Sequence, residues 1–160
     1  MTSLIVTILL WVTALSSGVM AGVYFTFSTF IMRAFGTLEA PLAVAAMNAI
    51  NIVILRSLFM PLFFGSSVIS VLLVVAAVMN WGESGAGMAL LAGLLYFLGM
   101  FVCTVLFNVP LNNALGALAP STDDFQLWTH YLKTWTNWNH LRTISSVLTC
   151  SLCVWLLSSH

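Results

Sequence analysis

The chain has 160 residues, of which 61% are hydrophobic and only 5% are charged. A soluble domain carries about 25% charged residues, because its surface faces water. Four basic and four acidic residues cannot keep a chain of 17.4 kDa in water, so most of its surface must face lipid. The net charge is zero, which gives no indication of nucleic-acid binding.

Four stretches of the sequence are long and apolar enough to cross a membrane, which takes about 20 residues in a helix. They are residues 4–32, 57–79, 88–107 and 141–157. No lysine or arginine precedes the first stretch, and it is too long for a signal-peptide core, so we expect it to be a span. The sequence therefore predicts an all-α, transmembrane four-helix bundle that forms a single domain over residues 1–160.

The few basic residues predict the orientation of the bundle, since short cytoplasmic loops are enriched in lysine and arginine. Arg33 and Arg56 flank the first loop, and Lys133 and Arg142 lie in or beside the third. We expect both termini outside and the first and third loops in the cytoplasm, with the protein in the plasma (inner) membrane.

Small residues recur along one side of the first span when it is drawn as a regular helix. Because small residues let helices approach closely in lipid, this side is predicted to face the bundle and to allow a homodimer. Its members are Ala14, Gly18, Ala21, Gly22, Phe25, Ser28, Thr29, Met32 and Arg33; Val19, Val23, Phe27, Phe30 and Ile31 form the opposite side.

Two further segments interrupt the simple pattern of spans. Residues 42–55 are apolar except for Asn48 and Asn51, which are three residues apart and share a helix face; they predict a short helix at the interface or against the bundle. Asn108, Pro110 and Asn112 follow the third span. They predict either a helix break that lines a cavity or an ordinary helix exit.

The last element is predicted to be one helix that begins near Ser121, with Asp123 and Asp124 at its positive end. The inward side is identified by small and hydroxyl residues in its membrane half. By continuity that side carries Trp128, Tyr131, Trp135, Trp138, Asn139 and Arg142, whereas His130, Lys133 and His140 fall on the outer side.

Arg142 is the strongest candidate for chemistry, because a charge inside a span is costly and is usually paired or functional. Beside Asn139 it could hold a carboxylate, a phenolate or a developing oxyanion; the alternative is an arginine that reaches the headgroups. The tryptophans could wall a mouth for a flat ligand together with Phe25, or form an interfacial belt. The sequence requires no cofactor and holds no metal motif, but a haem bound by His140 stays open.

Four segments resemble the anthrone oxygenase-like family of small four-span membrane proteins. They are residues 21–28 (AGVYFTFS), 46–51 (AMNAIN), 107–115 (FNVPLNNAL) and 135–143 (WTNWNHLRT). The resemblance implies a four-helix membrane fold and, in fungal members, oxidation of a tricyclic anthrone to an anthraquinone. The positions that match the family's motifs are Asn48, Asn51, Asn108, Asn112, Trp135, Trp138, Asn139, His140 and Arg142.

Three hypotheses follow for the function. The first is a membrane oxidoreductase for an apolar, anthrone- or quinone-like substrate that enters from the bilayer into a cavity near the cytoplasmic helix ends. Phe25, Trp135, Trp138, Asn112 and Asn139 would line this cavity, Arg142 with Asn139 would stabilise an enolate, and His140 or Tyr131 would accept the proton. The second is a haem- or metal-binding redox protein with His140 as ligand, and the third is a non-catalytic subunit or carrier.

Overall fold

A computed structural model describes residues 4–117 and 124–159 of the chain, and in these residues every regular element is a helix. The predicted bundle is confirmed, since four helical stretches are long and apolar enough to cross a membrane. The predicted helix start at Ser121 and Asp123 lies outside the described residues. The elements are α1 (Leu4–Thr26), η1 (Phe27–Ile31), α2 (Met32–Phe35), α3 (Ala40–Ile54), α4 (Phe59–Met79), α5 (Ala86–Tyr96), η2 (Phe97–Val102), η3 (Thr104–Asn108), α6 (Val109–Gly116) and α7 (Asp124–Ser158).

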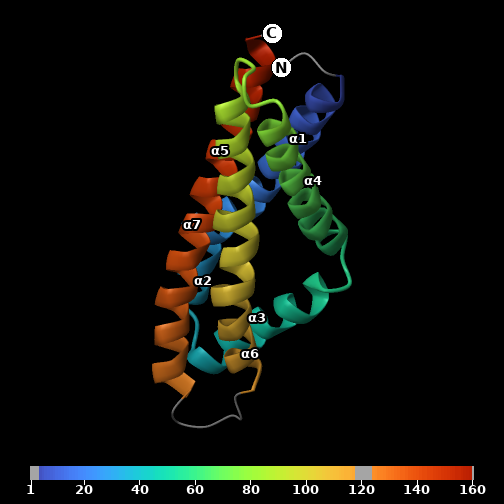
Figure 1. Cartoon of the computed structure of the whole chain (residues 1–160). Coiled ribbons are helices and arrows are strands. Elements are labelled where there is room, and N and C mark those ends of the chain that lie inside the picture. The colour runs from blue at the N-terminus through green and yellow to red at the C-terminus, as the bar shows by residue number, and fades with distance from the viewer. Residues whose placement is uncertain (1–3, 118–123, 160) are drawn as a thin grey trace.

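The spans differ in length, and this difference shapes the molecule. The second span is α4 alone, with 21 residues, or about 31 Å of helix, close to the hydrocarbon thickness of a bilayer. Leu4–Phe35, Ala86–Gly116 and Phe125–Ser158 are half as long again. These three helices therefore continue past the start of α4, where the predicted short helix α3 lies across their ends (Figure 1).

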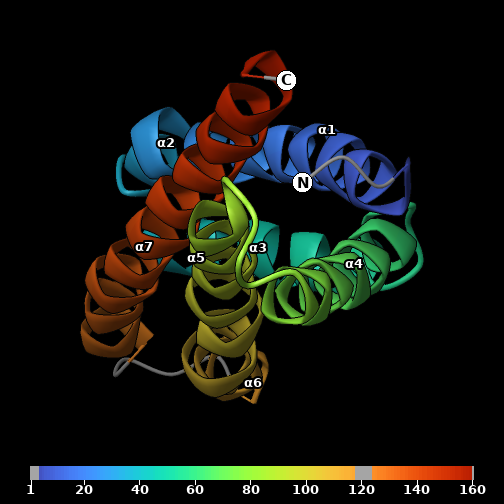
Figure 2. The same ribbon diagram turned by 45° about the horizontal axis from the view of Figure 1, so that its top comes forward.

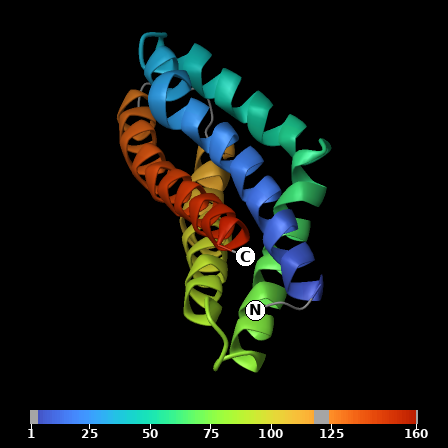
Figure 3. The same ribbon diagram turned by 90° about the horizontal axis from the view of Figure 1, so that it is seen from above.

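The helices are arranged as two crossing pairs. α7 packs on α1, and α4 packs on α5. The views from above show α1 and α7 crossing while α4 leans away from α5 toward α3 (Figures 2 and 3). The first and last described residues lie at the same end of the bundle (Figure 1), as an even number of spans requires; which side of the membrane they occupy stays a prediction.

The end of the bundle that holds the termini is closely packed by small and aliphatic side chains. Its core joins α1, α4, α5 and α7, and it includes Leu10, Leu73, Ala77, Ala92 and Cys153. Gly93 brings α5 against α4 so closely that a Cβ there would lie 2.8 Å from the backbone oxygen of Ser70. Small residues thus set the helix spacing here, as is typical of helices packed in lipid.

Pro110 neither breaks nor ends the third span, so both predicted alternatives, a helix break and an ordinary helix exit, are wrong. The helix widens into π-helical turns in η2 and η3 and continues as α6 to Gly116. Pro110 stands in the first turn of α6, where its missing N–H and fixed φ are tolerated. The wide turns of η3 shift the hydrogen-bond pattern just before it, as π-bulges do.

The predicted inward side is correct for α7 and partly wrong for the first span. On α7 the side from Trp128 to Arg142 is buried, apart from a half-buried Trp138. On the first span, Gly22 and Arg33 face outward and Phe25 is 55% exposed. The buried stripe instead follows Thr13, Ser17, Met20 and Tyr24 and meets the predicted side at Ser28.

Candidate functional site

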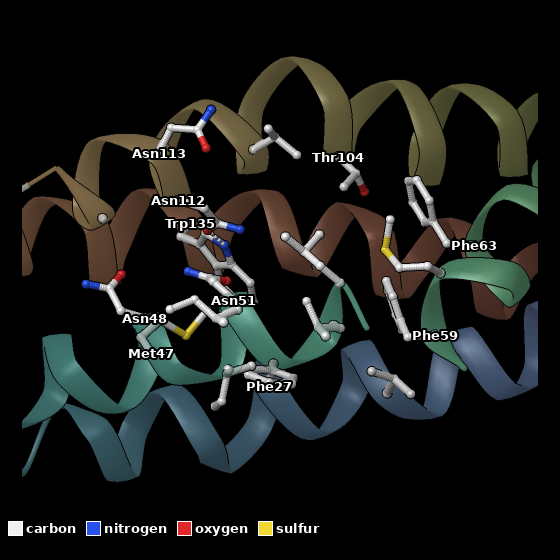
Figure 4. A pocket seen from close by; sticks show the side chains of 18 of the residues that line it. Phe27, Met47, Asn48, Asn51, Phe59, Phe63, Thr104, Asn112, Asn113 and Trp135 are labelled. Atoms are coloured by element: carbon white, nitrogen blue, oxygen red, sulfur yellow. Dashed lines mark hydrogen bonds between the residues drawn. The ribbon is translucent and has the colours of Figure 1, made fainter. Parts of the chain in front are cut away.

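A cavity of about 690 Å³ lies in the half of the bundle that α3 covers, between α1, α3, α4, α6 and α7. Its asparagines gather with Trp135 at one end, and Phe59 and Phe63 stand at the other (Figure 4). The lining residues are Val23, Tyr24, Phe27, Met47, Asn48, Ile50, Asn51, Ile52, Ile54, Leu55, Phe59, Met60, Phe63, Thr104, Val109, Asn112, Asn113, Gly116, Ala117, Trp135 and Arg142.

Arg142 supplies the charge of this cavity and is almost completely buried, with 4% of its surface exposed. Its guanidinium carbon lies 4.4 Å from the ring centre of Tyr24 and 4.9 Å from that of Trp135, so the cation is held between two aromatic faces. Nη1 donates to Thr104 Oγ1 at 3.4 Å, and Nε has no hydrogen-bond partner. The hydrogen-bond partners of Arg142 are thus neutral side chains.

Asn139 fixes the position of Arg142 from behind the cavity wall. Its Oδ1 accepts a hydrogen bond of 2.7 Å from Arg142 Nη2. Its Nδ2 donates to the backbone oxygen of Tyr24 and to Ser28 Oγ, both at 2.7 Å. Ser28 in turn bonds to Thr143 Oγ1 at 3.0 Å. Because every link is buried, the guanidinium is held in one orientation toward the cavity.

Asn112 is a second polar residue of the cavity wall, and two hydrogen-bond donors hold its side chain in place. Its Oδ1 accepts hydrogen bonds from Tyr131 Oη at 2.8 Å and from Trp135 Nε1 at 2.9 Å. An indole N–H can only donate, so the amide oxygen must face Trp135. Tyr131, predicted to accept a proton, is buried outside the cavity lining and donates to Asn112.

The other predicted asparagines divide between the cavity and its support. Asn48 and Asn51 of α3 line the cavity; Asn48 Nδ2 donates to the backbone oxygen of Leu115 at 3.4 Å, and Asn51 Nδ2 is buried without a hydrogen-bond partner. Asn108 is buried outside the lining and donates to the backbone oxygen of Trp135 at 3.3 Å. It ties η3 to α7.

Besides Tyr131, Asn108 and Asn139, which lie outside the lining although Asn139 was predicted to be part of it, three more predicted residues do not reach the cavity. Trp138 stacks on Phe107 with ring centres 3.8 Å apart, between α7 and η3. Phe25 is on the outer face of α1, because the glycines of that helix do not mark its inward side. His140 is exposed on the outer side of α7, as the helix periodicity indicates and against the family resemblance, so it contacts neither the cavity nor Arg142.

The sequence reasoning missed several residues of the site. Tyr24 and Thr104 surround Arg142, and Phe27, assigned to the lipid side, lines the cavity with its ring centre 5.6 Å from that of Trp135. Phe59 and Phe63 close the apolar end. The hydroxyls of Ser17 and Ser28 were the available signal for Tyr24, since one buried stripe contains all three. Phe27 begins the wide turns of η1, which a regular helix projection cannot include.

Groups that could bind a metal are scarce in the described part of the chain. No cluster of three or more histidine, cysteine, aspartate or glutamate side chains occurs among residues 4–117 and 124–159. His130, like His140, is exposed on α7. The described residues that line the cavity include no carboxylate and no histidine, so its chemistry depends on Arg142, amides, hydroxyls and aromatic rings.

These features define a class: a small multi-pass membrane protein with a largely apolar cavity between its helices and one buried arginine in the cavity wall. The chain belongs to the anthrone oxygenase family, whose sequence profile matches residues 58–152. The match runs from the start of α4 into α7 and includes Asn112, Trp135, Asn139 and Arg142, while α1 and α3 precede it. No curated protein and no solved structure matches the chain.

Proposed function

We propose that this protein oxidises a flat, apolar, anthrone-like substrate with dioxygen and that Arg142 stabilises the enolate form of that substrate. The observation that carries the proposal is a buried cation without a carboxylate partner in a cavity otherwise walled by apolar and aromatic groups. An unneutralised charge in a low-dielectric site interacts strongly with an anion. The family's profile match supports the reaction class.

The reaction needs no redox group from the protein. An anthrone gives a proton from its central methylene group to a water molecule and becomes an enolate, whose oxygen would lie against Arg142 Nη1. The enolate reduces dioxygen at that carbon: a C–O bond forms, the remaining C–H and the O–O bond break, and a ketone and one water result. Preorganised donors at the enolate oxygen lower the barrier to the first step.

The aromatic walls suit a flat substrate. Phe27, Trp135 and Tyr24 provide ring faces beside the guanidinium, and Phe59 and Phe63 extend the apolar surface away from it. A volume of about 690 Å³ falls within the range of about 300–1,000 Å³ found for small-molecule sites.

Entry from the bilayer fits the exposed part of the lining. Ile52, Leu55 and Val109 are 64%, 64% and 40% exposed, and they all line the cavity. An apolar rim beside a span favours a ligand that partitions into lipid before it binds. The predicted orientation would put this mouth near the cytoplasmic helix ends.

The test is the turnover of anthrone by the purified protein in lipid nanodiscs, followed as oxygen uptake and as anthraquinone absorbance. Arg142→Met keeps the length of the side chain and removes its charge and donors. We expect kcat to fall about 100-fold or more, the usual effect of losing an oxyanion donor. Thermal stability should change little, because removal of a buried cation that has no counter-ion offsets the lost hydrogen bond to Asn139.

Arg33→Met is the matched control, since Arg33 is an exposed arginine at the same end of the bundle. It should keep wild-type turnover. Wild-type turnover in Arg142→Met would overturn the role of Arg142, and a wild-type protein that accumulates no anthraquinone would overturn the proposed reaction.

A further inference from the structure

We propose that the amide nitrogen of Asn112 is a second ligand donor, so that the cavity recognises flat molecules with acceptor oxygens at two opposite edges. One oxygen would bind Arg142 and the other Asn112. This inference rests on the proposed function, because it specifies the substrate class of the same cavity. It adds a specificity-determining residue whose side chain takes no part in forming the enolate.

The hydrogen bonds of Asn112 determine which of its atoms remains for a ligand. Both protein donors, Tyr131 Oη and Trp135 Nε1, are directed at Oδ1. The Nδ2 group has no protein acceptor in these interactions, and Asn112 lines the cavity. A carbonyl oxygen accepts two hydrogen bonds at most, so Oδ1 is fully used and only N–H donors are left.

Asn51 lies beside this donor position, on the opposite wall. Its side chain stands close to Asn112 and Trp135 at the same end of the cavity (Figure 4). Its own Nδ2 has no hydrogen-bond partner, but this atom is closed off from the cavity. The amide of Asn112 is therefore the donor at this end that a ligand can reach.

The two donor positions lie on different sides of Trp135. Arg142 lies 4.9 Å from the centre of its ring, and Asn112 accepts from its N–H at 2.9 Å. Phe27 contacts the same indole, with ring centres 5.6 Å apart, so no ligand fits between these two rings. A flat ligand in the cavity would lie beside the Phe27–Trp135 pair, with one edge toward Arg142 and another toward Asn112.

This arrangement assigns the second oxygen of the proposed reaction. An anthrone has one oxygen on its central ring, and the anthraquinone carries a second oxygen on the opposite edge. With the first oxygen at Arg142, dioxygen would add at the carbon that faces Asn112. Its amide would then donate to the oxygen that remains on the ring.

The experiment compares the binding of anthraquinone and anthrone, which differ by this one oxygen, to the protein in nanodiscs under anaerobic conditions. We expect wild-type protein to bind anthraquinone about tenfold more tightly, the effect of one buried hydrogen bond. Asn112→Asp still accepts from Tyr131 and Trp135 but presents an oxygen to the cavity. Its preference should fall to about one or reverse, since two acceptors repel.

Asn137→Asp is the matched control, because Asn137 is exposed on α7 and lies outside the cavity lining. It should keep the tenfold preference. If Asn112→Asp does not fold, Tyr131→Phe removes one of the two donors that hold Oδ1, and the preference should fall about threefold while the affinity for anthrone is unchanged.

Equal binding of the two ligands by wild-type protein, or no binding of either, would overturn the inference. An unchanged preference in Asn112→Asp would do the same. Failure of the proposed function gives a different result, because the preference would persist without anthrone turnover. Turnover without a preference would instead retain the function and remove Asn112 from ligand recognition.

Discussion

The two halves of this bundle share three long helices but differ in the helix that packs against these three. In the half with the termini, α4 lies against α5, and alanines, serines and Gly93 hold the helices together. The other half lies beyond Phe59, the first residue of α4. There α3 crosses the bundle at an angle in place of α4 (Figure 1). The cavity thus comes from the place where one helix stops, whereas the side chains on the continuing helices decide its chemistry.

The polar residues of the two halves also have different partners. In the half with the termini, which we call the closed half, most hydroxyls donate to carbonyls of their own helix. Ser67 donates to the Phe63 carbonyl, and Ser70 donates to the Ser67 carbonyl. Beside the cavity, side chains bond across helices, as Asn139 does to Tyr24 and Ser28 of the first span. Hydroxyls therefore serve close packing in one half, and amides orient Arg142 in the other.

Among the variants that test this difference between the two halves, Gly93→Ala is expected to have the largest effect on stability. The added Cβ would lie 2.6 Å from Val74 Cγ2 and 2.8 Å from the backbone oxygen of Ser70. Overpacking of this kind costs about 1–3 kcal/mol, and we expect a loss of that size in mixed-micelle denaturation. Because the contact lies in the closed half, anthrone affinity below the melting transition should stay within about twofold.

Gly65→Ala is the control, since Gly65 belongs to the facing helix α4 and a Cβ there meets nothing within 4 Å. Its stability should equal that of the wild type or exceed it slightly. Equal stabilities for the two variants would show that the closed half is not held by close approach at Gly93.

A smaller effect is expected from Ser28→Ala, which acts on the support of Arg142. The change removes one of two acceptors of Asn139 Nδ2 and leaves the Tyr24 carbonyl. We expect a stability loss of about 1 kcal/mol. In the anthrone assay kcat should fall about fivefold with KM nearly constant, because the orientation of the guanidinium matters most for the enolate.

Thr29→Ala is its neighbouring control. The Thr29 hydroxyl donates only to the Phe25 carbonyl of its own helix, at 2.7 Å, so both kcat and stability should change little. A Ser28→Ala protein with unchanged kcat would mean that Asn139 holds Arg142 without help from Ser28.

Much of this fold and part of the site could be predicted from the sequence. The inward side of α7 was predictable because hydroxyl and aliphatic residues separate cleanly on one regular helix, so Trp135, Asn139 and Arg142 were correctly placed. The inward side of the first span could not be predicted from its glycines, because Gly22 faces open space. Its π-helical turns in η1, like those before Pro110, also rotate side chains away from a 100° projection.

The cavity itself could not be predicted, because it depends on tertiary packing. The cavity is lined by Met60 and Phe63 of α4 together with Ile52 of α3. These residues meet only because α3 and the start of α4 lie on the same side of the cavity. An apolar residue that faces a cavity has the same pattern in sequence as one that faces lipid. Cross-helix hydrogen bonds such as Tyr131 to Asn112 likewise need the positions of two helices.

The smallest effect is expected from His140→Ala, and it separates the inner from the outer side of α7. His140 is exposed, next to the buried Asn139, so its removal should change stability by less than about 0.5 kcal/mol. Turnover of anthrone should stay within about twofold, because no atom of the cavity lining belongs to this residue. A large loss of turnover would mean that the outer side of α7 takes part in the reaction. A Soret band in the purified wild-type protein that is absent in His140→Ala would identify that side as a haem site. In either case the role of the buried cavity would have to be reassigned.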